Sequence, residues 1–274
     1  MVDNRSARKR AGLFVVEGPQ GVREAVNFDP QLTNEVYATE AALARYPEIA
    51  TAVENQNISL NLASPEVLAS ISGNAQELVA IRETSQRRLN DWLQTSKQPN
   101  LIAILNNARD PGNVGTIIRV ADAFGADAVM LTGDSVEITN PKVVRSTAGS
   151  LFHLPVFAEP ALGEVIALCQ GAGLQILAAD GSGDLELPLP APLQPPLPTA
   201  WLFGNEAWGL TQPERDLADH VIRVPIYGHA ESLNLATAAT VCLWESTRHA
   251  TRQDTRHVTG NQPKPPPAPH SYTP

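Results

Sequence analysis

Short apolar runs alternate with segments of helical spacing in the first part of the chain. Runs of strand type occur at residues 13–16 (LFVV), 36–39 (VYAT), 58–62 (ISLNL) and 77–81 (ELVAI). Helical spacing lies between them, and Ser64 followed by Pro65 is typical of a helix start. The pattern predicts a compact α/β domain that ends near Arg82.

From Leu101 onward the alternation becomes regular. Helices are expected between apolar strands, the first from about Val114 to Phe124 and the last from Asn234 to about His249. Apolar strands that alternate with helices are typical of a mostly parallel sheet covered on both faces. The expected strands are 101–105, 128–131, 154–157, 174–179, 201–204 and 221–226.

Three polar or proline-rich stretches divide the chain. Residues 82–100 form a polar linker, and the proline-rich stretch 187–198 is expected to be an exposed loop. From residue 251 proline and polar residues cannot supply a core, so a flexible tail is expected there. We therefore predict an N-terminal domain at 1–95, a second domain at 96–250 and a tail at 251–274.

The charge balance limits how this protein can hold a nucleic acid. The formal net charge is −9, which argues against attachment by bulk electrostatics. A local basic cluster remains at Arg5, Arg8, Lys9 and Arg10, which could equally be the solvated face of a helix. No apolar run could cross a bilayer and no signal peptide is recognisable, so we expect a cytoplasmic protein without a membrane partner.

Cysteine and histidine residues give no sign of a metal site. Cys169 and Cys242 lie in apolar helical stretches without ligands at metal-binding spacing, and are expected to be core thiols. His153, His220 and His229 are isolated from one another. We expect no metal and interpret the histidines as structural or surface residues, although His229 lies in the candidate loop 224–240 and could touch RNA.

The first of three candidate loops at strand ends is NNARDPGNVGTIIRVADAFGA at 106–126. Pro111 and Gly112 predict a tight turn, and Asn113 is expected to cap the following helix. Arg119 lies beside the buried stripe of that helix and can point toward the loop.

The second and third loops are WLFGNEAWGL at 201–210 and VPIYGHAESLNLATAAT at 224–240. Glu206 lies at a strand end between glycines, a weak functional signal by itself. Ser232 and Asn234 precede a helix of small residues and could simply be its caps. Trp208 could stack on a base or pack against a second copy of the chain.

Together, DPGNVGTIIR, GNEAWGL and VPIYG…ESLNLATAA resemble the SpoU family of RNA ribose methyltransferases over residues 100 to 248. The opening RSARKRAGLFVVEGPQGVREAV is similar to the ribosomal-protein-like RNA-binding domain of that family. The resemblance implies a smaller N-terminal α/β RNA-binding domain and a larger domain knotted as a deep trefoil. It also implies a homodimer that uses S-adenosylmethionine.

The resemblance also assigns roles to individual residues. The implied catalytic residues are Asn113, Arg119, Glu206, Ser232 and Asn234. Those implied to bind S-adenosylmethionine are Gly204, Glu206, Val224, Ile226, Ser232 and Leu233. The implied RNA-binding residues are Arg8, Arg10, Arg119 and Arg145, although Arg145 could also be an ordinary surface arginine. The implied partner is structured RNA and not DNA.

Elementary chemistry is consistent with this reading. S-adenosylmethionine has no phosphates, so no phosphate-binding glycine loop is needed, and Gly181-Ser182-Gly183 lacks the third glycine of a dinucleotide site. A nicotinamide-dependent oxidoreductase is therefore disfavoured. A guanidinium is a poor base near neutral pH, so Arg119 could either accept a proton in a perturbed environment or bind phosphate and stabilise alkoxide charge.

Two alternatives to an rRNA methyltransferase stay open. One is a non-catalytic RNA-binding protein of the same fold, and the other is a tRNA ribose methyltransferase. The two-domain layout favours ribosomal RNA, particularly 23S rRNA, as the substrate. Housekeeping modification and antibiotic self-resistance are not distinguished by the sequence.

Overall fold

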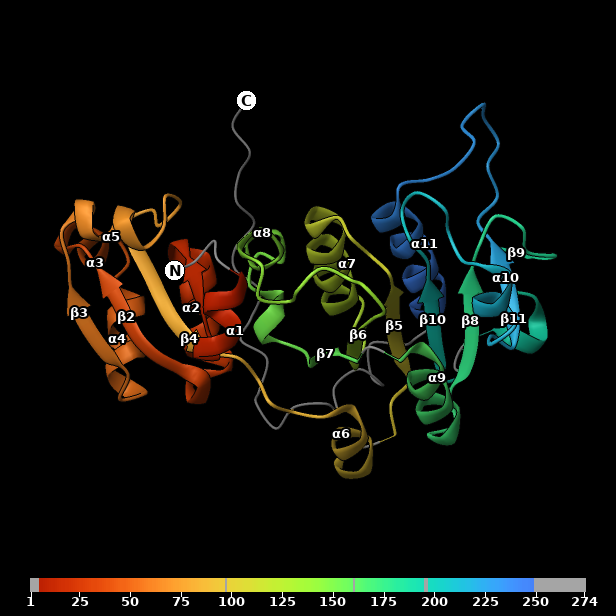
Figure 1. Ribbon diagram of the computed structural model, residues 1–274, viewed down its shortest axis with the longest axis horizontal. Helices are drawn as coiled ribbons and strands as arrows, with labels where there is room; N and C mark the ends of the chain where they lie inside the picture. The colour runs from red at the N-terminus through yellow and green to blue at the C-terminus, as the bar shows by residue number, and fades with distance from the viewer. Residues whose placement is uncertain (1–4, 97, 160, 195–196, 249–274) are drawn as a thin grey trace.

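The computed structural model describes residues 5–96, 98–159, 161–194 and 197–248, which form two α/β units (Figure 1). Each unit is built around its own sheet, four-stranded near the N-terminus and seven-stranded in the rest of the chain. The expected tail at 251–274 lies outside the described residues. The predicted α/β class and two-sheet arrangement are confirmed.

The N-terminal unit is a mixed sheet in the order β1-β4-β2-β3, where β4 is antiparallel to both neighbours and β2 is parallel to β3. Its elements are α1 (Arg5–Ala11), β1 (Leu13–Glu17), α2 (Gly18–Phe28), β2 (Thr33–Ala38), α3 (Glu40–Arg45), α4 (Pro47–Asn55), β3 (Ser59–Leu62), α5 (Pro65–Ile71) and β4 (Leu78–Glu83). As expected, Ser64 caps α5 by accepting from Val67 N–H, and Pro65 is the first helical residue.

The larger unit has the strand order β7-β6-β5-β10-β8-β11-β9, and all of its strand pairs are parallel. Its strands are β5 (Leu101–Asn106), β6 (Ala128–Thr132), β7 (Val156–Ala158), β8 (Gln175–Ala179), β9 (Leu185–Glu186), β10 (Thr199–Phe203) and β11 (His220–Arg223). Its helices are α6 (Leu89–Thr95), α7 (Pro111–Ala123), α8 (Pro141–Ser146), α9 (Leu162–Gly171), α10 (Gln212–Arg215) and α11 (Leu235–Thr247).

Helices cover both faces of this sheet, as the continuous apolar strands predicted (Figure 1). Alternate residues of β5 illustrate the arrangement: Leu101, Ala103 and Leu105 pack with α7 and α11, whereas Ile102 and Ile104 pack with α6 and α9. Because both faces are buried, the loops at the strand ends are the parts of this unit that can receive a ligand.

The polar stretch at 82–100 is more than a linker. It contains α6, and Leu89 of this helix is buried in the core of the larger sheet. The Leu89 backbone N–H donates to the Glu159 carboxylate at 3.4 Å. Trp92 lies 5.6 Å from the ring of Phe157. Helix α6 therefore packs with the larger unit.

The prediction that residues 187–198 form an exposed loop is wrong for three of its four leucines, whereas Leu197 is exposed. Leu187, Leu189 and Leu193 are buried in the same core as α11. The Leu189 N–H donates to the buried Glu245 carboxylate of α11 at 2.8 Å. Because prolines separate the leucines, the segment needs few hydrogen-bond partners and can lie against α11.

The prediction of two core thiols is confirmed. Cys169 lies in the core beside α6, and Cys242 lies in the core between α11 and the sheet. Burial raises the pKa of the Cys169 thiol to about 12, and it also raises the pKa of Cys242. Neither thiol is therefore poised as a nucleophile. None of the helices in the described ranges is long and apolar enough to cross a membrane.

The two units share a contact region formed by α2 and β1 on one side and by α8 and residues 150–153 on the other. Val144 and Phe152 of the larger unit are buried in the N-terminal core. Glu17 of β1 accepts a hydrogen bond from Arg145 of α8. The guanidinium of the buried Arg82 lies 4.5 Å from the centre of the Phe152 ring. These contacts hold the N-terminal unit against the larger one.

His153 adds a charged contact to this region. Its Nδ1 lies 2.7 Å from an oxygen of Asp122 on α7, and its Nε2 lies 3.2 Å from an oxygen of Glu24 on α2. Hydrogen bonds to Asp122 and then to Glu24 raise the pKa of His153 from 6.5 to about 9. The imidazolium therefore links the two units at neutral pH, which confirms the structural role expected for this histidine.

We expect this link to make stability depend on pH. A folded-state pKa raised from 6.5 to about 9 contributes stability that is complete below pH 6.5 and is lost as the pH rises through 9. The free energy of unfolding should fall by about 1 to 2 kcal/mol more across that window in the wild type than in His153→Gln. Urea unfolding at the two ends of the window measures the difference, and equal slopes for the two proteins would contradict the assignment.

Candidate active site

Three loops leave the carboxyl edge of the larger sheet. They are residues 107–110 after β5, residues 204–211 after β10 and residues 224–234 after β11. β5 and β10 are neighbours, and β11 lies beyond β8 on the far side of β10. The loops therefore open over the middle of the sheet, where parallel α/β sheets bind ligands.

Helix α7 begins at Pro111, and its N-cap is Asp110. The Asp110 carboxylate accepts from the Asn113 backbone N–H at 2.7 Å. The prediction that Asn113 caps this helix is therefore wrong, because Asp110 followed by Pro111 supplies both the cap and the first helical residue. As a consequence, the Asn113 side chain is available for contacts outside the helix.

The Asn113 amide joins the other two loops. Its Oδ1 accepts from Asn234 Nδ2 at 2.9 Å, and its Nδ2 donates to a Glu206 carboxylate oxygen at 3.4 Å. Asn234 also caps α11, since its Oδ1 accepts from the N–H groups of Ala236 and Thr237 at 2.9 and 3.3 Å. Asn234 therefore caps α11 and also contacts Asn113, and Ser232 is not the cap.

Glu206 fixes the first loop from the second. Its carboxylate accepts from the backbone N–H groups of Arg109 and Asp110 at 3.2 and 3.0 Å. A side chain that holds two N–H groups of a neighbouring loop sets the position of that loop. We call Asn113, Glu206 and Asn234 the loop junction, because together they connect all three loops.

Close backbone contacts shape the 204–210 loop. Asn205 and Gly209 exchange backbone hydrogen bonds of 3.1 and 2.9 Å, and Asn205 Nδ2 donates to the Asn107 carbonyl at 2.6 Å. Gly204 is buried against this turn, and a Cβ atom there would lie 2.4 Å from the carbonyl carbon and oxygen of Gly209. The sequence GNEAWG therefore folds into a turn that requires glycine at position 204.

The segment 224–234 exposes groups that suit a nucleoside. Ile226 and Leu233 are exposed apolar side chains and Val224 is half-buried. Within the described part of the chain, the backbone N–H groups of residues 226–233 form no hydrogen bond. Apolar side chains can contact an adenine, and unbonded N–H groups can donate hydrogen bonds to an adenine and a ribose. This segment therefore fits S-adenosylmethionine. Ser232 is also exposed here.

Arg119 is a cation without a protein partner in the described ranges. It projects from α7 and is exposed, and no hydrogen bond or ion pair to another described residue occupies its guanidinium. It lies on the helix that starts at the loop junction. An exposed, unpaired guanidinium at such a place can bind a phosphate or a developing negative charge.

The other arginines expected to bind RNA are placed differently. Arg8 is buried and forms a 2.6 Å ion pair with Glu137, and Arg145 pairs with Glu17. Arg10 is exposed on α1. Trp208 is exposed too, and the Arg109 guanidinium lies 5.3 Å from its ring centre. The structure therefore assigns Arg8 and Arg145 to contacts between the two units.

Sequence reasoning missed several residues that support the site. Glu214 of α10 accepts from Asn106 and Asn107 at 2.6 and 3.4 Å, which fixes the end of β5. The role of Asp110 could have been found, because Asp before Pro is a typical helix start. The pairing of Asn106 with Glu214 joins positions 108 residues apart and leaves no local signal.

Known protein families match both units of the chain. The family described as "SpoU rRNA Methylase family" matches residues 100–244, and "RNA 2'-O ribose methyltransferase substrate binding" matches residues 15–88. The chain belongs to the SpoU rRNA methylase family. The resemblance noted in its three motifs is therefore confirmed, and the loop junction of this SpoU protein is built from those motifs.

Individual SpoU relatives match nearly the whole chain. The 23S rRNA (uridine(2479)-2'-O)-methyltransferase of Streptomyces viridochromogenes is 32% identical over 267 residues, covering 90% of this chain and 87% of the relative. The 23S rRNA (guanosine-2'-O-)-methyltransferase RlmB of Nitrosomonas europaea is 30% identical over 227 residues, covering 80% and 85%. The crystal structure of the SpoU methyltransferase AviRb from S. viridochromogenes with AdoMet is 31% identical and has a TM-score of 0.75, covering 89% and 93%.

Proposed function

We propose that this protein transfers a methyl group from S-adenosylmethionine to a ribose 2′-hydroxyl of 23S ribosomal RNA. The observation that carries the proposal is the loop junction, which joins the three loops beside the exposed segment 224–234. The family and the named activities of relatives that align over most of the chain support the same reaction.

The cofactor would be held by residues of the second and third loops, namely Gly204, Glu206, Val224, Ile226, Ser232 and Leu233. S-adenosylmethionine supplies an electrophilic methyl group on its sulfonium when it is bound. Ile226 and Leu233 offer apolar contacts, and the unbonded backbone N–H groups of the segment offer hydrogen bonds to polar edges. Glu206 and Asn113 keep the loops in register and so orient the site.

Arg119 is assigned to the RNA. A guanidinium is a poor base near neutral pH, so Arg119 acts as a cation. In that role it binds a phosphate of the substrate and stabilises negative charge that develops on the ribose oxygen. Asn113, Asn234 and Ser232 complete the proposed catalytic group by positioning the loops and the hydroxyl around it.

Ribosomal RNA is favoured over transfer RNA and over a purely binding role. The N-terminal unit matches a substrate-binding domain, and a second unit of this size suits a large structured RNA. This chain has Arg119 and every residue of the loop junction. A protein that only binds RNA would not need all of them. A ribosomal substrate places the proposed activity in the cytoplasm.

We also infer a trefoil knot and a homodimer. Helix α11 packs against α7 and the central strands β5, β8 and β10, and residues 187–193 cover it. Such an enclosed helix is consistent with a chain end threaded through a loop.

Trp244 of α11 is 54% exposed and its ring lies 5.7 Å from that of Phe124 on α7. A second copy of the chain would cover this apolar surface.

Transfer of labelled methyl from S-adenosylmethionine to unmodified ribosomal RNA tests the function, with nuclease mapping of the product. Label on the ribose of one 23S nucleotide is the expected result. Label on transfer RNA alone would show that transfer RNA, and not ribosomal RNA, is the substrate. Binding of the cofactor and the RNA without any transfer would support the non-catalytic alternative.

A further inference from the structure

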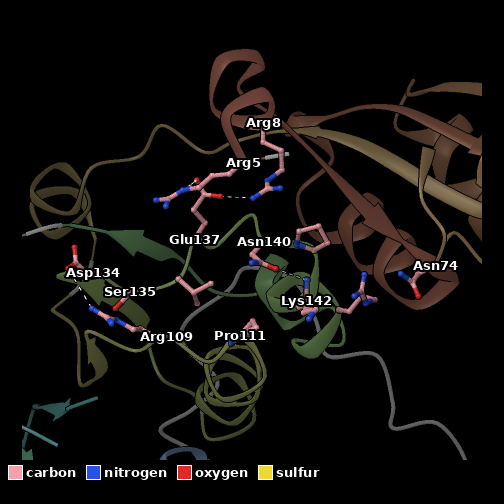
Figure 2. A pocket seen from close by; sticks show the side chains of 13 residues that line it. Arg5, Arg8, Asn74, Arg109, Pro111, Asp134, Ser135, Glu137, Asn140 and Lys142 are labelled. Carbon is pink, nitrogen blue, oxygen red and sulfur yellow. Dashed lines mark hydrogen bonds and ion pairs between the residues drawn. The ribbon is translucent and has the colours of Figure 1, made fainter. Parts of the chain in front are cut away.

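A groove with a volume of about 510 Å³ lies between the two units, beside the start of α7 (Figure 2). Arg5, Arg8 and Asn74 from the N-terminal unit line it, together with Arg109, Pro111 and residues 134–137, 140–142 and 145 of the larger unit. We propose that this groove binds the sugar-phosphate backbone of nucleotides that flank the methylated ribose. This inference rests on the function proposed above and gives it a second RNA contact.

The charge of the groove is opposite to that of the chain. Five cationic side chains line it against the two carboxylates of Asp134 and Glu137, although the chain carries a net charge of −9. A concentration of cations in a concave surface attracts the phosphates of a nucleic acid. The cationic residues are Arg5, Arg8, Arg109, Lys142 and Arg145.

Some of these cations serve to hold the walls of the groove. Glu137 is only 14% exposed and accepts from Arg5 at 3.0 Å and Arg8 at 2.6 Å, which fastens α1 to the larger unit. Arg145 pairs with Glu17 in the same way. The carboxylates of Glu137 and Glu17 therefore hold these arginines in place, and the resulting groove is lined by both units.

Lys142 and Arg109 keep their charge available. Lys142 is exposed at the start of α8 and forms no ion pair with another described residue. Arg109 is 58% exposed, and its only ion pair in the described ranges is with Asp134, at 3.8 Å, whose side chain is 87% exposed. Such an exposed pair is weak, so a phosphate can replace Asp134 at the guanidinium.

The groove borders the first loop of the candidate active site. Arg109 and Pro111 line it, and between them Asp110 caps the helix that carries Asn113 and Arg119. The Arg109 backbone N–H is held by Glu206 of the loop junction. An RNA strand whose phosphates lie along Lys142 and Arg109 therefore has its next nucleotide at the loop junction. Fixing the backbone there sets which ribose reaches the site.

The first test is the salt dependence of RNA binding by the full chain, with a 23S rRNA fragment that contains the methylated nucleotide. Lys142→Ala should weaken binding several-fold and reduce the slope of log K against log salt concentration by about 1. Arg88→Ala removes an exposed charge at the N-cap of α6, outside the groove, and should leave the slope closer to that of the wild type. Calorimetry should show unchanged affinity for S-adenosylmethionine in both variants.

The second test maps the RNA against the groove. Because Cys169 and Cys242 are buried, an iron chelate attached to Lys142→Cys reacts at the introduced thiol. Hydroxyl radicals from that site should cleave nucleotides next to the methylated one, and the same probe on Arg88→Cys should cleave elsewhere. With whole 23S rRNA, the salt slope and the cleavage pattern can both be recorded without methyl transfer, so they remain informative if the proposed reaction fails.

Two outcomes would overturn the inference. One is an unchanged salt slope for Lys142→Ala together with cleavage far from the target nucleotide. The other is a groove that takes free phosphate only, in which inorganic phosphate protects Lys142→Cys from alkylation but the RNA fragment does not. Cleavage of 23S rRNA at one discrete site by a protein that transfers no methyl group would instead keep the groove and reject the reaction.

Discussion

Replacing Arg119 with alanine should lower kcat for ribose methylation by about 10²- to 10³-fold, the usual effect of removing one group that stabilises developing negative charge. Arg119 is exposed on α7 and has no partner among the described residues, so its substitution removes no contact that supports the fold. The loss should appear in single-turnover methyl transfer at saturating RNA. Affinity for S-adenosylmethionine, measured by calorimetry, should change little.

Arg119→Lys separates the two roles considered for this residue. Lysine keeps the positive charge but lacks the planar fork that binds a phosphate at two oxygens, so partial activity is expected with a wild-type pH profile. A proton-accepting role would instead shift the pH profile in Arg119→Lys, because an ammonium has a lower pKa than a guanidinium. A fully active Arg119→Ala enzyme would reject both roles.

The parallel sheet could be predicted because its strands are buried on both faces. Residues 101–105 are apolar without a break, and such a run has few alternatives to a central strand. The sequence predicted the strands at the β9 edge of the sheet less well. β9 contains only Leu185 and Glu186, too few residues for any periodicity, and β11 ends at Arg223 although the apolar run continues to Ile226.

Packing partners distant in the sequence explain the remaining errors of fold. The leucines at 187, 189 and 193 looked like part of a surface loop because prolines surround them, yet α11 supplies an apolar surface that covers them. The cluster at Arg5 to Arg10 looked like a free basic patch. Its Arg8 instead forms an ion pair with Glu137, 129 residues away, and no local pattern reveals such a pair.

The candidate site was predicted by motif and not by physics alone. Asn113, Glu206 and Asn234 each had a plausible local role as a cap or a surface residue. Their meeting depends on loops that leave three different strands, which only the topology brings together. The motif therefore indicated which residues belong to the site, and the structure adds that two neutral amides and one carboxylate connect it.

Gly204→Ala should reduce affinity for S-adenosylmethionine by about 100-fold or more and lower the free energy of unfolding by about 1 to 3 kcal/mol. The new Cβ would lie 2.4 Å from the backbone carbonyl of Gly209 and 2.7 Å from the nitrogen of Leu210. Backbone atoms cannot rotate away as a side chain can, so the whole 204–210 turn must shift. Glu206 would move with it and lose its hydrogen bonds to the 107–110 loop. Calorimetry with the cofactor and urea unfolding measure the two effects.

Gly163→Ala is the matched control for this substitution. Gly163 lies in α9, and an added Cβ would meet nothing within 4 Å, so alanine there should stabilise the protein by about 0.5 to 1 kcal/mol and leave cofactor affinity unchanged. A Gly204→Ala protein that binds S-adenosylmethionine like the wild type would show that the turn does not shape the cofactor site. A loss of cofactor affinity far larger than the loss of stability would show that the turn shapes the cofactor site, because a merely destabilised fold would still bind once folded.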